Sequence, residues 1–219
     1  TVILNGLDQS RLIQSSNELN TGLFFAGDLS DSQTCIKLES YIANNVGHLD
    51  YLVCNAGGGA THGHDPNSVE AWDYLIKNNL MTTVNTVNSC EQFLGLSSMP
   101  SIVCISSICG STVIPDAPIG YSCSKAALNM YIRCKAIQLS EMKIRLNAVE
   151  PGNIIFEGSV WERRSNADPI GTKKILSKVP LKSFGTPSDI SALTWFLLSE
   201  QSQFTTGSIY RTDGGQSLV

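Results

Sequence analysis

The sequence predicts an α/β fold, in which a single domain holds a doubly wound parallel sheet with helices on both faces. Short apolar runs rich in valine and isoleucine alternate along the chain with longer amphipathic stretches, which is the pattern of consecutive βαβ units. The chain has 219 residues, a length that suits one domain with a sizeable core.

Six short runs of β-branched, aromatic and other apolar residues predict strands, and most are bounded by turn-forming residues. In chain order they cover residues 1–4, 22–26, 51–54, 101–105, 144–149 and 208–211. The amphipathic stretches between them predict helices at residues 9–19, 32–45, 69–94, 121–141 and 187–199. Asp31 and Thr186 are typical N-caps, since their side-chain oxygens can accept hydrogen bonds from the first turn of the following helix.

One long segment, residues 151–185, interrupts the alternation and has mixed composition. A segment of this length inside a compact domain usually has a function. We expect residues 153–185 to form a substrate loop or lid.

The composition excludes several classes of partner. The net charge is −4 and only 16% of the residues are charged, so neither a nucleic-acid groove nor a basic membrane patch is expected. The longest apolar runs are far shorter than the ~18 to 20 residues of a membrane helix, and no signal peptide is visible. We expect a cytoplasmic protein whose partner is a small neutral or mildly polar molecule.

Cysteines and histidines suggest no metal site. The seven cysteines lie mostly within apolar runs and predict small buried side chains in a reducing compartment. The loop at residues 61–65 offers two histidines and one acid, whereas a zinc site needs three or four converging ligands. We expect a surface loop beside the substrate instead.

Tyr121 and Lys125 stand four residues apart within a predicted helix. This spacing places both side chains on one face, with their Cβ atoms about 5 to 6 Å apart. A charged lysine favours the phenolate, so we expect it to lower the pKa of the tyrosine, each unit being worth about 1.4 kcal/mol. A solvated surface pair is the alternative, and the surrounding residues decide between the two.

Polar residues and glycines collect directly after the predicted strands. In chain order these are Asp28, Asn55 to Gly59, Ser106, Ser107, Pro151 and Gly152. Ligands of doubly wound sheets bind at the carboxyl ends of the strands, so we expect one site at this edge. The three consecutive glycines would let the backbone approach a flat or phosphorylated ligand, although a flexible turn has the same composition.

Taken together, these residues resemble the short-chain dehydrogenase/reductase family along nearly the whole chain. The matching pieces occur in the family's order and are Gly27-Asp28-Leu29, Asn55-Ala56-Gly57, Asn79, Ile105 to Gly110, Tyr121 with Lys125, Pro151 to Ile154, and Thr212 to Gly215. The resemblance implies a Rossmann-like sheet, a nicotinamide cofactor (NAD or NADP), and reversible hydride transfer between a small carbonyl and a secondary alcohol. It also implies a homo-oligomer, either a dimer or a tetramer.

The resemblance assigns catalytic roles to four residues. Tyr121 would be the general acid in reduction and the base in oxidation, and Lys125 would lower its pKa and hold the nicotinamide ribose. Ser107 would hydrogen-bond the substrate oxygen as charge builds there, and it is preferred to Ser106 because it directly precedes the Ile-Cys-Gly turn. Asn79 would hold a water that links the lysine to solvent, with Asn78 as the alternative.

The resemblance also assigns the cofactor contacts. The adenine would lie against Asp28 and Leu29. The other contacts would come from Asn55, Ala56 and Gly57 around the adenosine, and from Pro151, Gly152 and Ile154 at the nicotinamide. Phe156 departs from the pattern, because the family often has a threonine there that contacts the carboxamide.

One part of the family's pattern is missing. Family members open with a strand and a Thr-Gly-x-x-x-Gly-x-Gly turn whose amides bind the pyrophosphate, and the sequence has no such turn. The run from Thr1 to Leu4 resembles the family's second strand instead. About 30 residues, one strand-turn-helix unit, are therefore expected to be lacking, with a gap between the strand at Thr1 and the strand ending at Cys54.

Three explanations are open. The missing unit precedes a sequence that starts late, or the chain is truncated and partly misfolded. Alternatively, residues 1–4 take the first-strand role, with Gly6 as a poor phosphate turn. We favour the first. The corresponding alternatives to an active oxidoreductase are a dinucleotide-binding paralogue that has lost catalysis and an inactive fragment.

The choice between NAD and NADP is weakly marked. At the end of the Thr1 strand, family members that use NAD tend to carry an acid, and those that use NADP an arginine. Gly6 and Leu7 occupy these places, with Asp8 and Arg11 close by. The lack of an acid at Gly6 favours NADP slightly.

Overall fold

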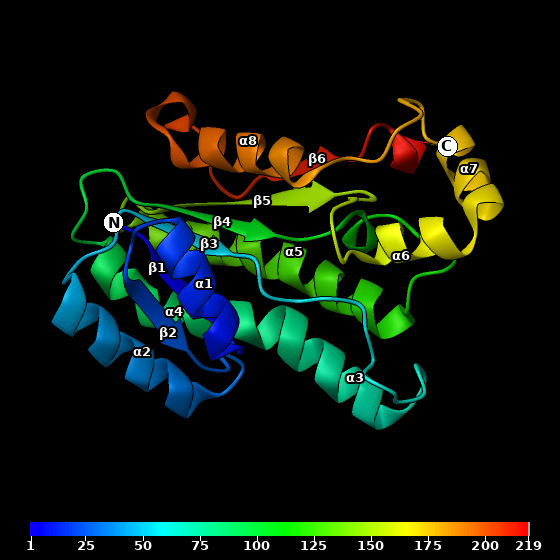
Figure 1. The fold of residues 1–219 in the computed structure, drawn as a ribbon. Coiled ribbons are helices and arrows are strands. Elements are labelled where there is room, and N and C mark those ends of the chain that lie inside the picture. Colours follow the sequence, from blue (N-terminus) through cyan, green and yellow to red (C-terminus); the bar gives the residue numbers. More distant parts are fainter. Residues whose placement is uncertain (219) are drawn as a thin grey trace.

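The computed structural model describes residues 1–218 and confirms the α/β fold, with strands lying between layers of helices (Figure 1). Every strand pairs in parallel with its neighbour. The strands are β1 Ile3–Gly6, β2 Leu23–Ala26, β3 Tyr51–Cys54, β4 Ser101–Ile105, β5 Arg145–Pro151 and β6 Ile209–Thr212. The predicted range 1–4 is two residues early for β1, because Asn5 and Gly6 also pair with β2.

Eight α-helices connect and cover the strands within residues 1–218. They are α1 Gln9–Glu18, α2 Ser32–Asn45, α3 Val69–Ile76, α4 Thr82–Leu94, α5 Ile119–Ser140, α6 Val160–Ala167, α7 Pro169–Lys178 and α8 Pro187–Leu198. Asp31 caps α2 through the amide of Thr34, and Thr186 and Asp189 form a capping box on α8. Both predicted helix starts are therefore confirmed.

The helices lie on opposite faces of β4 and β5, with α8 on one face and α5 on the other (Figure 1). Successive strand residues point to opposite faces, and the core follows this rule. Ile102 and Leu146 belong to the cluster that includes Leu128 of α5. Val103 belongs to the cluster that includes Leu197 of α8.

The sheet is divided between β1 and β3. Among the described residues, β1 and β2 form one sheet and the order β3-β4-β5-β6 forms another. The two free edges belong to the strands between which the sequence predicts a gap. Tyr51 and Val53 of β3 are 39% and 45% exposed, which is unusual for a strand of this apolar character.

Side chains rather than strand pairing join the two sheets. Ile3 and Phe25 pack against the cluster that holds Ile102, and the Asn85 amide of α4 donates hydrogen bonds to the carbonyls of Leu29 and Ser30, at 3.1 Å each. The explanation that gives residues 1–4 the first-strand role is wrong for this structure, because β1 has only β2 as a neighbour and Gly6 lies inside the strand.

Two predicted segments differ from the structure. The helix predicted at residues 69–94 is interrupted by a π-helical turn at Lys77–Met81, because side-chain periodicity does not reveal one extra residue in a turn. The segment 151–185, for which no helix is predicted, contains α6 and α7. Both are short, and α6 buries none of its residues, so neither has the apolar stripe that marks a helix.

The sequence predicts that most of the seven cysteines are buried, and four of them are. Cys123 and Cys134 are exposed, and Cys109 is half-buried. Within residues 1–218, no helix combines the length and apolar character that crossing a bilayer requires.

Candidate active site

A cavity of about 300 Å³ lies at the carboxyl ends of β3, β4 and β5, beside the first turns of α5. The residues that line it are Asn55, Gly57, Ile105, Ser106, Ser107, Tyr121, Lys125, Pro151, Gly152 and Phe156. Loops that are far apart in the sequence therefore meet at the edge of the sheet where the sequence places the site.

Gly57 occupies a position that only glycine can take without strain. Its φ is 143°, and a Cβ atom there would lie 2.6 Å from Asn79 Oδ1 and 3.5 Å from Lys125 Nζ. The backbone after β3 thus passes close to both side chains, an approach that a Cβ atom would prevent.

The side-chain amide of Asn79 is hydrogen-bonded to the backbone of the glycine loop. It is fully buried, its Oδ1 accepts from the Gly58 amide at 2.9 Å, and its Nδ2 donates to the carbonyls of Gly58 and Leu75. The residue lies in the π-helical turn, a feature often found at functional sites. Asn78 is only half-buried, so of the two neighbours Asn79 is the one that the structure places against the glycine loop.

Lys125 and Tyr121 lie on the same face of α5, as their spacing predicts. Lys125 is 3% exposed, and its Nζ lies 5.9 Å from the centre of the Tyr121 ring. Nζ donates a hydrogen bond to the carbonyl oxygen of Ile105 at 2.9 Å. The pair is therefore not solvated, which excludes the surface-pair alternative.

The prediction that Lys125 lowers the pKa of Tyr121 is wrong for this structure. Burial raises the pKa of the phenol, and the interaction with the Ser107 hydroxyl only opposes that rise. Burial also lowers the pKa of Lys125 to about 8. The loss of water on burial is the main cause of both shifts in pKa, and spacing along the sequence carries no information on burial.

The two serines after β4 have different surroundings. Ser106 is 4% exposed, and its hydroxyl donates to Asn129 Oδ1 at 2.7 Å. Ser107 interacts with the phenol of Tyr121, and its Oγ accepts from the backbone amide of Cys109 at 3.2 Å. Ser106 is thus bound to the protein interior, whereas Ser107 and Tyr121 both line the cavity and influence one another there.

The remaining predicted residues do not line the cavity. Asp28 is exposed and accepts a hydrogen bond from the Ser30 amide, whereas Leu29 is buried in the core. Ala56 lies exposed between two lining residues, and Ile154 bridges to Gly185 at the base of the segment that holds α6 and α7.

Two features of the site are not predicted from the sequence: the Ile105 carbonyl that accepts from Lys125, and the buried side chains around Ser106. The carbonyl gives no signal in the sequence, because any residue would supply it. The partner of Ser106 is Asn129, whose own partner is Glu150, and both lie far from Ser106 along the chain.

Three comparisons with known proteins agree with this geometry. A family model described as enoyl-(acyl carrier protein) reductase matches residues 1–217. The 2-(S)-hydroxypropyl-CoM dehydrogenase 3 of Xanthobacter autotrophicus is 30% identical over 224 residues, which cover 100% of this chain and 87% of the relative. Isoepoxydon dehydrogenase of Penicillium expansum is 27% identical over 190 residues, with 87% of this chain and 72% of the relative covered.

Among solved structures, the NADPH-bound short chain oxidoreductase of Pseudomonas aeruginosa superposes with a TM-score of 0.87 at 24% identity, covering 98% of this chain and 86% of the other. At this identity the likeness concerns the fold.

Proposed function

Since the chain belongs to the short-chain dehydrogenase/reductase family, and is therefore an oxidoreductase that uses a nicotinamide cofactor on carbonyl or alcohol substrates, we propose that Tyr121 exchanges the proton in this reaction. The observation that carries the proposal is the convergence of Tyr121, Ser107 and Lys125 on one cavity beside the glycine loop. A nicotinamide dinucleotide supplies or accepts the hydride when bound.

The residues around the cavity fit the nicotinamide end of such a cofactor. Gly57, Lys125, Pro151 and Gly152 line one cavity, in which a flat ring and its ribose would contact backbone and the ammonium group. Lys125 would donate to the ribose hydroxyls. No Thr-Gly-x-x-x-Gly-x-Gly turn, which holds the pyrophosphate in the family, occurs within residues 1–219.

Proton transfer follows from the surroundings of Tyr121. Because burial raises its pKa, the phenol stays protonated at neutral pH and is ready to donate to a substrate oxygen that becomes an alkoxide. The Ser107 hydroxyl lies beside the phenol and would donate to the same oxygen, stabilising the charge that develops in the transition state. At neutral pH Tyr121 is accordingly in the protonation state that carbonyl reduction requires.

The experiment that tests this role replaces Tyr121 by Phe. We expect turnover to fall by at least about a hundredfold, the scale of general acid catalysis, with cofactor affinity retained. Tyr131→Phe is the matched control, since Tyr131 lies on the same helix with a buried hydroxyl that has no hydrogen-bond partner. Equal turnover in the Tyr121 variant and the wild type would remove the proposed acid.

We also propose NADP as the preferred cofactor. Asp8 Oδ1 accepts hydrogen bonds from the backbone amides of Ser10 and Arg11 at the start of α1. The carboxylate is thereby engaged in capping, whereas the Arg11 guanidinium is 87% exposed and makes an ion pair with Asp8 at 3.6 Å. A solvated arginine at this edge suits a 2′-phosphate better than free ribose hydroxyls.

A second copy of the chain is the proposed protein partner. Three large apolar side chains of α5 are mostly exposed, namely Ile119 (62%), Met130 (56%) and Ile137 (74%). Their spacings of 11 and 7 residues put them on one face of the helix. An exposed apolar stripe of this kind marks an interaction surface, and a homo-oligomer would bury it.

One observation favours a second function, that of a dinucleotide-binding paralogue without catalysis. The divided sheet leaves β1 and β3 with one neighbour each among the described residues. Cofactor binding without any turnover of carbonyl compounds would support this alternative.

A further inference from the structure

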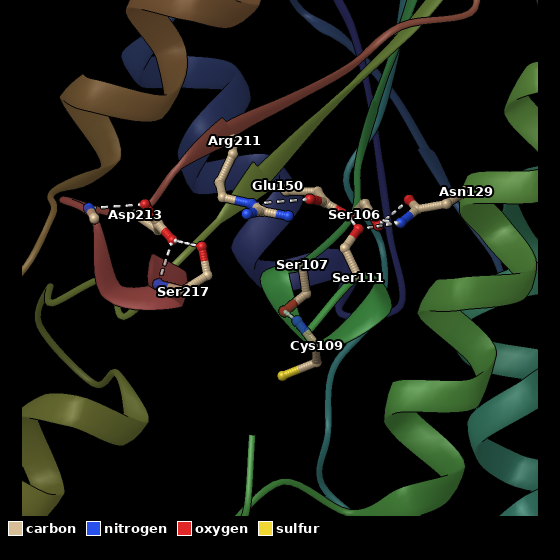
Figure 2. A network of polar contacts seen from close by, with 10 residues as sticks. Ser106, Ser107, Cys109, Ser111, Asn129, Glu150, Arg211, Asp213 and Ser217 are labelled. Atoms are coloured by element: carbon tan, nitrogen blue, oxygen red, sulfur yellow. Dashed lines mark hydrogen bonds and ion pairs between the residues drawn. The ribbon is translucent and has the colours of Figure 1, made fainter. Parts of the chain in front are cut away.

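A buried carboxylate, that of Glu150, lies next in sequence to Pro151, which lines the candidate active site. Glu150 of β5 is 2% exposed, and its Oε1 accepts hydrogen bonds from Asn129 Nδ2 at 2.6 Å and from the Ser111 hydroxyl. Its Oε2 lies 3.6 Å from Arg211 Nε on β6. Figure 2 shows Ser106, Ser111 and Asn129 converging on Glu150, with Arg211 on the other side.

Burying this network costs free energy, and the fold does not require a carboxylate at this position. Burying a carboxylate is unfavourable unless it is paired and hydrogen-bonded, and here both of its oxygens have partners. An apolar side chain at the same place would avoid this cost. The network therefore calls for a role besides stability.

The network holds both ends of the segment that carries Ser107. Asn129 accepts from the Ser106 hydroxyl at 2.7 Å and donates to Ser111 Oγ at 3.3 Å, so it holds the residues on both sides of the Ile108–Gly110 turn. Lys125 lies one helical turn before Asn129 and holds the carbonyl of Ile105. Residues 105 to 111 are thus bound to α5 at both ends.

The turn lies so close to α5 that its position is sensitive to these contacts. A Cβ atom on Gly110 would lie 2.8 Å from the backbone of Lys125 and 2.9 Å from Asn129 Nδ2. Tyr121 belongs to the same helix. Any shift of the turn relative to α5 therefore changes the distance between Ser107 and Tyr121 directly.

We propose that Asn129 and Glu150 are positioning residues for the reaction, which hold the Ser107 hydroxyl against Tyr121 in the geometry that proton transfer requires. The proposal rests on the function proposed above for Ser107 and Tyr121. Asn129 acts through Ser106 and Ser111, and Glu150 fixes the Asn129 amide by accepting from it, while Arg211 balances the charge. Neither residue lines the cavity.

A double-mutant cycle tests the proposal. Asn129→Leu keeps the volume of the side chain and removes its hydrogen bonds. We expect it to lower kcat about tenfold or more, since a small misplacement of a catalytic group costs up to about a hundredfold, and to leave the Kd of the cofactor unchanged. When Ser107→Ala is already present, Asn129→Leu should lower kcat by less than about twofold further.

The outcomes separate this proposal from the proposed function. If Ser107→Ala alone has no effect on kcat, the function proposed for Ser107 fails and the positioning role fails with it. If Ser107→Ala lowers kcat and Asn129→Leu lowers it by the same factor in both backgrounds, only the positioning role is overturned. A loss of cofactor affinity equal to the loss in kcat would also overturn it.

Two further variants guard against a general loss of structure. Ser111→Ala is a milder change that removes one donor to Glu150, and the same dependence on Ser107 is expected, with an effect of about threefold. Ser101→Ala is the matched control, because its buried hydroxyl donates to the Leu197 carbonyl at the opposite end of β4. It should lower thermal stability and leave kcat unchanged.

Discussion

The ammonium of Lys125 donates a hydrogen bond to the carbonyl oxygen of Ile105 at 2.9 Å, while it lies 5.9 Å from the centre of the Tyr121 ring. The lysine therefore has a structural contact with the end of β4 in addition to the role toward a cofactor that the family resemblance implies. Its burial lowers its pKa to about 8, which has a measurable consequence.

We predict that Lys125 makes stability depend on pH between about 8 and 10.5. Its folded pKa of about 8 lies below the ordinary value of 10.5, so the unfolded chain binds more protons in this window and stability rises with pH. The contribution is complete above pH 10.5 and is lost as the pH falls through 8. Urea denaturation of the wild type minus that of Lys125→Met, at several pH values, should show a rise on the order of 3 kcal/mol. A flat difference would contradict the buried lysine.

Gly57 and Gly58 form a matched pair for a test of the glycine loop. Gly57→Ala would force a side chain into a φ of 143° and against Asn79, so we expect a loss of about 1 to 3 kcal/mol in stability together with most of the activity. Gly58→Ala meets nothing within 4 Å and should be tolerated in both assays. Equal behaviour of the two variants would show that the loop does not approach Asn79 as described.

The free edges of β1 and β3 should exchange their amide hydrogens faster than β4 and β5. Among the described residues, β4 and β5 have a neighbour on each side, whereas β1 and β3 have one each. Strands paired on one side open locally at a lower free energy. Hydrogen exchange followed by mass spectrometry measures this difference, and equal protection of all four strands would mean that another segment covers the gap in solution.

Arg11→Ala should distinguish the two cofactors. If the exposed guanidinium binds the 2′-phosphate, its loss should raise the KM for NADPH about tenfold, the effect of losing one hydrogen bond to a charged group. The KM for NADH serves as the internal control and should change by less than about twofold. Equal changes for both cofactors would refute the proposed preference for NADP.

Ile137→Glu should separate the proposed oligomer. A charge in the middle of an apolar interface leaves an unpaired buried group, which weakens association strongly. Sedimentation velocity should then show a smaller species than the wild type. Phe204→Glu is the control, because Phe204 is fully exposed but lies outside α5, and it should leave the size unchanged. A wild type that sediments as a monomer would contradict the proposal.

The sequence predicts the fold well where local pattern and tertiary structure agree. The strands Tyr51–Cys54 and Ser101–Ile105 and the helix Ser32–Asn45 have the predicted bounds. The strands are short apolar runs with polar residues or glycines nearby, and the helix has an amphipathic period and the N-cap Asp31. The helices α6 and α7 escape prediction, since short helices with little buried surface lack that period.

The candidate site, like the fold, is predicted only in part from the sequence. The lining residues Gly57, Ser107, Tyr121 and Lys125 follow from their positions after strands and along one helix. The pKa of Tyr121 does not follow, because it depends on burial. The network around Glu150 does not follow either, because Asn129, Glu150 and Arg211 come from three elements that meet only in the folded chain.

In the proposed reaction, this chain transfers a hydride from the cofactor with Tyr121 as the proton donor. Its most direct test is to incubate the protein with NADPH that is deuterated at the transferable position and a panel of small carbonyl compounds, and to analyse the products by mass spectrometry. We expect an alcohol with one deuterium at the carbinol carbon from the wild type, and at least about a hundredfold less from Tyr121→Phe. Binding of NADPH with no labelled alcohol from any compound in the panel would contradict it.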